Sequence, residues 1–464
     1  AGLTPFGDGG TFFQRFEMHE SRVDTAATHL EVDGKTFAFG TDVVIRSLAG
    51  PISGSFPLVY VGHGWSIPDK AIDPYAGVDV KGKIVVAHGP RAMPKGLEVN
   101  QIGRVTPGAS NVVTEAAKRG ALGVILVPQT SALATWDEMA RQNLTRKELT
   151  PPVPSAYAAA PATSVLLSRA AAEALFFGER VTGSELLARG DESDYPPSFE
   201  LGKRVQLTVA ATTTVHRLYN VVAMIEGTDP VLKNEYITVE SHLDGAVGSR
   251  TVDGDAIYNS ADDNASGSAA NLSIAELMTG VRPKRSIIFI WDSGEEQGLW
   301  GTRHFVGTPP VPIERIVAHV NIDMIGANKA PGSPDAAAER VSGPNEVFLI
   351  GPGVLSAKAD ALLQRVNDAY LKMTFNRAWD TPDSEFFYPR TDAGPFLERG
   401  VLTIGFTTGI HDRYHLPADD AKALDPSKME KIARTIFASL WALADSSDRP
   451  GIDKPIPATV PRYR

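Results

Sequence analysis

Acidic residues and histidines follow several predicted strands, and these residue types bind divalent metal ions. The first group is Asp262-Asp263-Asn264, which lies in a loop before a predicted apolar helix over 269–278. Taken alone, adjacent aspartates before a helix favour a capping loop over a metal site. The residues that follow the other predicted strands reverse this preference.

In open α/β sheets, ligands bind at the carboxyl ends of the strands. The candidates there are His242 and Asp244 after the strand 236–239, Glu295-Glu296 after 287–291, Asp323 after 316–322, and Tyr414-His415 after 401–406. Each alone favours a structural role, such as a satisfied histidine or a solvated turn. Together they predict a site for zinc or a similar divalent ion, because they form a set of nitrogen and oxygen ligands.

The number of ligands fits two ions better than one. The chain has no cysteine, so any zinc must be held by His, Asp and Glu. If Asp263 bridges two ions, His242 and Asp323 complete one site, and Glu296 and His415 complete the other. Two cations that share a carboxylate and a water are the arrangement of dinuclear aminopeptidases.

The remaining residues of the group suit supporting and catalytic roles. Asp244 would accept the ring N–H of His242 and fix its tautomer. Glu295 would act as the general base, taking a proton from the metal-bridging water and passing it to the leaving amine. Tyr414 and Tyr388 are candidates to stabilise the oxyanion, and for each of them packing is an equally good interpretation.

These segments, in their order along the chain, resemble metallopeptidase family 28, the co-catalytic zinc aminopeptidases and glutamate carboxypeptidases. The resemblance implies that Asp263 is the bridging ligand, that Glu295 is the base and that the peptide bond between Asp263 and Asn264 is cis. It also implies a five-residue ligand set of His242, Asp263, Glu296, Asp323 and His415. One departure is Thr391-Asp392-Ala393, where many members have Ser-Asp-His or Ser-Asp-Tyr, so the family's substrate contacts there are not carried over.

Predicted strands and helices alternate from about residue 205 onward, and these elements position the candidate ligands. Helices are predicted over 269–278, 355–371 and 428–444, the last two with apolar residues at helical spacing. The strands are predicted over 218–225, 236–239, 286–291, 316–322, 346–350 and 401–406. This alternation predicts an α/β fold with a mixed, largely parallel central sheet sandwiched by helices.

Residues 51–190 differ from the rest of the chain in having short strand-like segments separated by turns, and this pattern predicts a compact β-rich module. The segments 75–85 and 118–125 resemble the protease-associated domain that some exopeptidases carry as an insertion. We therefore expect residues 1–50 to be the N-terminal part of the catalytic domain, 51–190 to be the protease-associated insertion, and 191–464 to complete the dinuclear zinc peptidase domain.

Charge and hydropathy exclude some classes of partner. The net charge of -10 argues against binding to nucleic acids or to anionic membranes, and no apolar run is long enough to span a bilayer. We expect a secreted or periplasmic protein whose signal peptide has been removed, acting on peptides. The sequence does not decide its oligomeric state.

The leading hypothesis is a zinc-dependent aminopeptidase. A carboxypeptidase or dipeptidase with the same metal chemistry is the alternative, and it would need a cationic pocket to which Arg377, Arg390 or Arg413 could contribute. A second alternative is a non-catalytic receptor built on a peptidase fold, and the presence of every ligand and of Glu295 argues against it.

Overall fold

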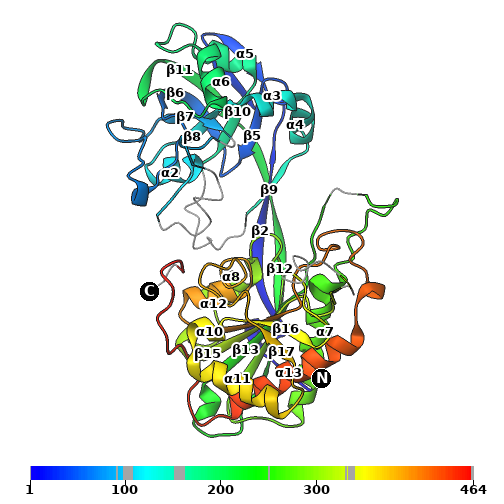
Figure 1. The fold of residues 1–464 in the computed structure, drawn as a ribbon. Coiled ribbons are helices and arrows are strands. Elements are labelled where there is room, and N and C mark those ends of the chain that lie inside the picture. The colour runs from blue at the N-terminus through cyan, green and yellow to red at the C-terminus, as the bar shows by residue number, and fades with distance from the viewer. Residues whose placement is uncertain are drawn as a thin grey trace. The chain divides into compact units, whose positions relative to one another are not determined.

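A computed structural model describes residues 2–89, 92–97, 108–150, 162–248, 251–329, 332 and 340–460 of the 464-residue chain. The chain divides into two compact units (Figure 1). The first unit comprises Ala1–Phe16 and Arg217–Arg464, and the second comprises Glu17–His216. In the described residues, no helix is long and apolar enough to cross a membrane. Secretion stays a prediction.

A mixed sheet forms the centre of the first unit. Its strands are, in order, β17 (Thr374–Asn376), β16 (Glu346–Ile350), β18 (Leu402–Thr407), β15 (Ile316–Ile322), β13 (Tyr236–His242), β14 (Ser286–Asp292), β12 (Ala211–Ile225) and β2 (Phe13–Val23), with β1 (Thr4–Pro5) also paired to β12. Strand β13 runs parallel to β14 and β15, and β15 runs parallel to β18, whereas β12 and β16 pair antiparallel to their neighbours β14 and β18. The predicted mixed, largely parallel sheet is confirmed.

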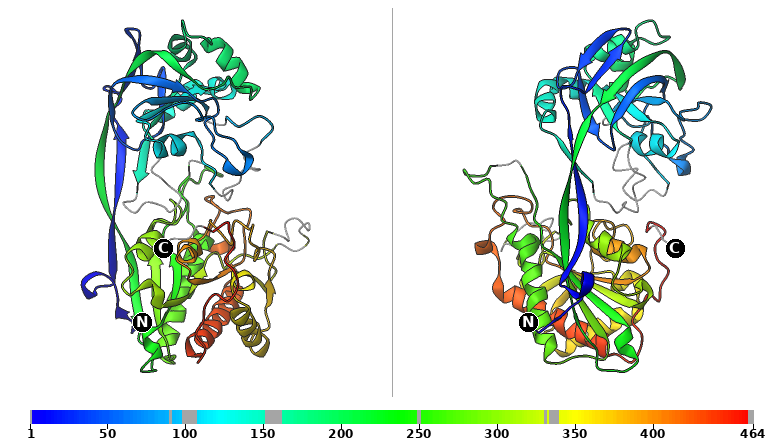
Figure 2. Two further views of the ribbon diagram at one scale, coloured as in Figure 1. Left: turned by 90° about the vertical axis from the view of Figure 1, so that its left-hand side faces the viewer. Right: turned by 180° about the vertical axis from the view of Figure 1, so that it is seen from behind.

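Helices cover both faces of this sheet, as Figures 1 and 2 show. Successive side chains of a strand point to opposite faces, so Ile287 and Phe289 of β14 pack in one core and Ile288 and Ile290 in another. The first core contains α7 (Gly267–Thr279), α10 (Pro352–Leu355), α11 (Ala357–Ala369) and α13 (Pro426–Asp445), and the second contains α8 (Trp300–Gly307) and α12 (Ala393–Glu398).

The second unit has its own sheet and, in the described residues, two large hydrophobic cores. The strand order is β4 (Lys35–Ala38), β3 (His29–Val32), β11 (Phe199–Val209), β6 (Ile52–Tyr60), β7 (Ile84–Gly89), β8 (Gly123–Pro128), β10 (Ser164–Leu167) and β5 (Val43–Ser47). Helices α5 (Arg169–Leu175) and α6 (Gly183–Asp191) belong to one core, and α2 (Val112–Lys118) and α4 (Trp136–Asn143) to the other. Helix α3 (Thr130–Ala134) and strand β9 (Lys147–Thr150), which pairs with β2, complete the unit.

The second unit is wider than the insertion predicted over 51–190. Strands β3, β4 and β5 precede residue 51 and β11 follows residue 190, yet all four belong to the sheet of this unit, since β11 pairs with both β3 and β6. Residues 17–50, predicted as part of the catalytic domain, therefore lie in the second unit. Its identity as a protease-associated domain stays a prediction.

Candidate metal centre

All five predicted ligands come from one edge of the first unit's sheet. His242 is the last residue of β13, Asp323 directly follows β15, and Glu296 lies in the loop after β14. Asp263 lies in the turn Ala261–Ser266 that leads into α7, and His415 follows β18. Parallel strands bring their carboxyl ends together, which explains how residues far apart in sequence meet.

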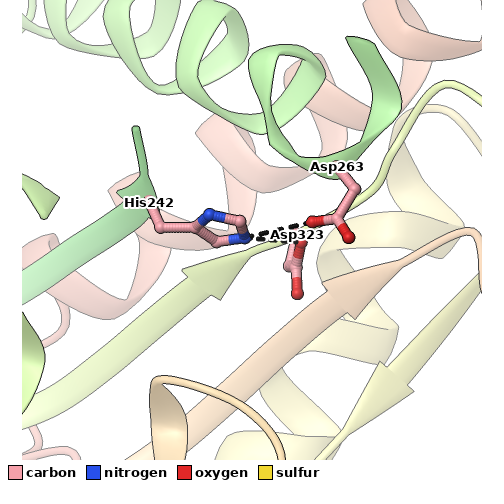
Figure 3. Close-up of side chains that lie close together, drawn as sticks. All are labelled: His242, Asp263 and Asp323. Atoms are coloured by element: carbon pink, nitrogen blue, oxygen red, sulfur yellow. Dashed lines mark ion pairs between the residues drawn. The ribbon is translucent and has the colours of Figure 1, made fainter. Parts of the chain in front are cut away.

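The carboxylate of Asp263 faces two histidines with its two oxygens. His242 Nε2 lies 3.2 Å from Asp263 Oδ1 and 3.4 Å from Asp323 Oδ1 (Figure 3). On the other side, His415 Nε2 lies 3.1 Å from Asp263 Oδ2 and 3.0 Å from Glu296 Oε2. The five residues thus form two three-residue groups, each with donors spaced as a metal ion requires, which share Asp263.

The hydrogen bonding of His242 fits a cation at the first group. Its Nδ1 lies 3.0 Å from the backbone carbonyl of Asp244, which can only accept, so Nδ1 carries the proton. In the neutral ring, Nε2 then presents a lone pair to the carboxylates of Asp263 and Asp323, and this buried nitrogen has no hydrogen-bond partner. Acceptors that face one another away from water need a proton or a cation between them.

The electrostatics of the two histidines agree with a cation at this position. Burial alone would lower the pKa of His242, but the carboxylates of Asp263 and Asp323 beside its Nε2 raise that pKa well above the usual value. Burial also opposes protonation of His415, and its contacts with Asp263 and Glu296 nevertheless raise its pKa to about 9. Each histidine nitrogen therefore faces carboxylates whose negative charge a metal ion would balance.

The turn that carries Asp263 is held by Asn264. The Asn264 side chain donates to the Ile322 carbonyl (2.9 Å) and accepts the backbone N–H groups of Gly267 (3.0 Å) and Met324 (3.2 Å). At Gly267, a Cβ would collide with Asn264 Oδ1 and with the Ile322 carbonyl, so this close approach requires glycine. The peptide bond between Asp263 and Asn264 is cis, as the resemblance implied.

The role of Asp244 differs from the prediction. Its carboxylate lies 3.9 Å from His242 Nδ1, and the backbone carbonyl of Asp244 makes that contact instead. The carboxylate accepts three backbone N–H groups, from Gly294 (2.8 Å), Glu295 (3.1 Å) and Glu296 (3.2 Å). Asp244 therefore anchors the loop that carries the predicted base and one ligand.

Glu295 and Tyr414 line one cavity together with Asp263 and Asp323. Burial raises the pKa of the Glu295 carboxyl well above its usual range. The Tyr414 hydroxyl accepts a hydrogen bond from Arg390 Nη2 (3.0 Å), and its ring stacks on His415 with centroids 3.7 Å apart. Both side chains are thus placed to act on a group bound beside Asp263.

The structure does not bring Tyr388 to this group. Its ring is buried in the core, its hydroxyl donates to Glu398 (2.9 Å), and it is not among the described residues that line the cavity. The predicted catalytic role of Tyr388 gains no support from this position.

Sequence reasoning missed three residues that support the centre. Asp419 accepts the backbone N–H groups of Asp262 and Asp263, each at 3.1 Å, and His411 Nε2 lies 3.2 Å from Asp262 Oδ2. Arg390 was considered only for a substrate carboxylate, whereas it contacts Tyr414. Their proximity in sequence to Tyr414-His415 and to Thr391-Asp392 was the available signal.

Comparison with known proteins relates about half of this chain to metallopeptidases. The model of peptidase family M28 matches residues 220–440. An aminopeptidase from Pseudomonas aeruginosa is 30% identical over 207 residues, covering 44% of this chain and 34% of that protein. A protein from Pyrenophora tritici-repentis named "Probable zinc metalloprotease" is 25% identical over 262 residues, covering 50% of this chain and 58% of that protein. The chain thus spans about a third to three fifths of these relatives.

The fold has a counterpart among solved structures. The aminopeptidase from Aneurinibacillus sp. strain AM-1 aligns over 97% of this chain and 87% of its own, with a TM-score of 0.50 and 17% identity. This likeness shows the shared fold. Residues 220–440 thus match the model of peptidase family M28, and the chain shares its fold with a solved aminopeptidase.

Proposed function

We propose that this chain is an aminopeptidase that binds two zinc ions and hydrolyses N-terminal residues from peptides. The observation that carries this proposal is the division of the Asp263 carboxylate between His242 and His415. One ion would be held by His242, Asp263 and Asp323, and the other by Asp263, Glu296 and His415. Two histidine nitrogens with carboxylate oxygens are a donor set that suits zinc. The names of the relatives support both zinc and aminopeptidase activity.

When bound, the zinc ions would polarise the scissile carbonyl and make a water nucleophilic near neutral pH. Glu295, raised in pKa and outside both ligand groups, would accept a proton from that water and deliver it to the leaving amine. The Tyr414 hydroxyl would donate to the oxyanion that develops on the carbonyl, with Arg390 holding the phenolic oxygen. The acids around the cavity would attract the free α-ammonium of the substrate.

The proposal is tested with aminoacyl p-nitroanilides assayed before and after treatment with a chelator. We expect hydrolysis that is lost with the chelator and restored by zinc. If a broad panel of these substrates gives no chelator-sensitive hydrolysis, the proposal is wrong.

Arg390 in the cavity lining favours a carboxypeptidase or dipeptidase as the second candidate, because a guanidinium can bind a substrate carboxylate. Arg377, by contrast, is paired with Asp360 (2.5 Å) and Asp380 (3.2 Å). Peptides blocked at either end separate the two activities. An aminopeptidase cleaves carboxyl-amidated peptides and leaves N-acetylated ones intact, whereas a carboxypeptidase does the reverse.

A further inference from the structure

Three acidic side chains, Glu240, Asp292 and Asp392, form a second carboxylate group in the first unit, here called the acidic cluster. Glu240 lies within β13, Asp292 is the last residue of β14, and Asp392 directly precedes α12. All three are buried, and each offers an oxygen within 4.8 Å of the oxygens of the other two. One ion could therefore contact all three carboxylates. None of them belongs to the ligand groups that share Asp263.

The hydrogen-bond donors around the acidic cluster are too few for its carboxylate oxygens. In the described part of the chain, Asn321 donates to Glu240 Oε2 (2.7 Å), and the single hydroxyl of Thr302 lies 3.0 Å from Asp292 Oδ2 and also contacts Asp392 Oδ1. Among the described residues, the buried atoms Glu240 Oε1, Asp292 Oδ1 and Asp392 Oδ2 have no hydrogen-bond partner. Each carboxylate thus keeps one unpaired oxygen, and both donors are neutral. Buried carboxylates in this state require a cation or protons.

A buried histidine points at the same cluster. His319 Nε2 lies 3.8 Å from Glu240 Oε2 and has no hydrogen-bond partner in the described residues. The Thr238 hydroxyl donates to the Ala318 carbonyl (3.4 Å), so His319 Nδ1 donates to that hydroxyl (2.9 Å) and Nε2 keeps its lone pair. Burial lowers the pKa of His319 to about 3, so the ring is neutral. Phe396 stacks on this ring with centroids 3.8 Å apart and holds its orientation.

We propose that the acidic cluster and His319 bind a third divalent cation, and that this cation is zinc. Three carboxylate oxygens and one imidazole nitrogen can fill the four positions of a closed tetrahedral zinc site. Calcium takes six to eight oxygen ligands, and magnesium keeps several waters, so a buried group of four ligands suits neither. The hydrogen bonds to the other carboxylate oxygens and from the ring Nδ1 would orient the ligands around the ion.

The acidic cluster lies next to the metal centre. Glu240 and His242 are two residues apart on β13, so their side chains point to the same face of the sheet about 7 Å apart. Asn321, which donates to Glu240, also lines the cavity that contains Asp263, so an ion could enter from there. The third ion would connect β13, β14 and the start of α12, which is a structural role and not a step of the reaction.

The first test counts the zinc ions in the purified full chain by elemental analysis, after saturation with zinc and dialysis against metal-free buffer. We expect three ions per chain in the wild type and two in Glu240→Gln and in Asp392→Asn, because each amide keeps the shape of the side chain and removes its charge. The matched control is Glu276→Gln on the exposed face of α7, which should keep three. A zinc content that both cluster variants leave unchanged would overturn the proposal.

A second test separates the third ion from the proposed function. The double variant His242→Ala/His415→Ala loses a histidine from each ligand group of the metal centre and keeps the acidic cluster intact. We expect it to retain one zinc ion. One retained ion, together with no hydrolysis of any peptide substrate by the wild type, would refute the aminopeptidase and support the third site. No retained ion, together with chelator-sensitive hydrolysis by the wild type, would refute the third site alone.

Anomalous diffraction at the zinc absorption edge locates the ion in crystals of the unmutated chain, so this test does not depend on whether a variant folds. We expect an anomalous peak between Glu240, Asp292 and Asp392, in addition to those beside Asp263. If zinc-saturated crystals show peaks beside Asp263 and none in the acidic cluster, its carboxyl groups share protons and the proposal is overturned.

Discussion

Substituting Asp244 by asparagine tests how the loop that carries Glu295 is held. The Asp244 carboxylate accepts backbone N–H groups from Gly294, Glu295 and Glu296 with both of its oxygens. Asparagine has one acceptor oxygen, so Asp244→Asn loses at least one of these bonds and the negative charge that strengthens the others. Hydrogen bonds to charged groups contribute about 1.5–3 kcal/mol each. If this loss appears in the transition state, kcat/KM falls about 10- to 100-fold.

The contact with His242 should survive this substitution, because the backbone carbonyl of residue 244 makes it. The assay is steady-state hydrolysis of a p-nitroanilide with increasing zinc, beside the matched control Asp368→Asn on the exposed surface of α11. We expect the loss of kcat/KM to persist at saturating zinc, because the substitution displaces Glu295. The control variant should match the wild type. Full activity of Asp244→Asn, or complete rescue by zinc, would refute this reasoning.

Three further predictions concern the base, the metal and a buried lysine. Glu295→Gln should lower kcat by about 10²- to 10⁴-fold and retain the zinc content measured by elemental analysis, because Glu295 belongs to neither ligand group; loss of metal would contradict its role as base. Chelation should lower Tm and zinc should restore it, because zinc binds the folded site and not the unfolded chain; an unchanged Tm would argue against a bound metal. Burial lowers the pKa of Lys428 from 10.5 to about 8, so above pH 8 the folded protein releases a proton that the unfolded chain keeps. Urea unfolding at pH 7 to 10 should therefore show the free energy of unfolding of the wild type rising relative to that of Lys428→Met, by up to about 1.4 kcal/mol per pH unit. A difference that falls with pH would refute the lowered pKa of Lys428.

The convergence of the five candidate ligands could be predicted because strand ends have a simple sequence signature. An apolar run followed at once by His or an acid, as at His242 and Asp323, places that side chain at a known edge of the sheet. The partner of Asp244 could not be predicted in this way. It depends on the loop 294–296, which starts at Gly294 with a φ of 83°, and local periodicity does not encode such a path.

Long-range pairing limited the prediction of the domain boundary. Strand β3 pairs with β11, whose residues are more than 160 positions further along the chain. The local sequence pattern therefore placed the predicted boundary near residue 51, whereas the second unit also contains strands that precede this residue. The choice between Tyr388 and Tyr414 also depended on packing, since the two are similar in sequence context and only Tyr414 lines the cavity.

The two strands that cross the boundary between the units have a consequence for how such a chain can be built. Strands β2 and β12 are neighbours in the sheet, with the Val222 N–H bonded to the Phe12 carbonyl on one side of the crossing and the hydroxyls of Ser21 and Thr213 in contact on the other. Residues 16 and 217, where the chain leaves and re-enters the first unit, thus lie on adjacent strands. In topological terms the second unit is the enlarged turn of a β-hairpin, so a short turn could replace it without reordering any strand of the metal-binding sheet.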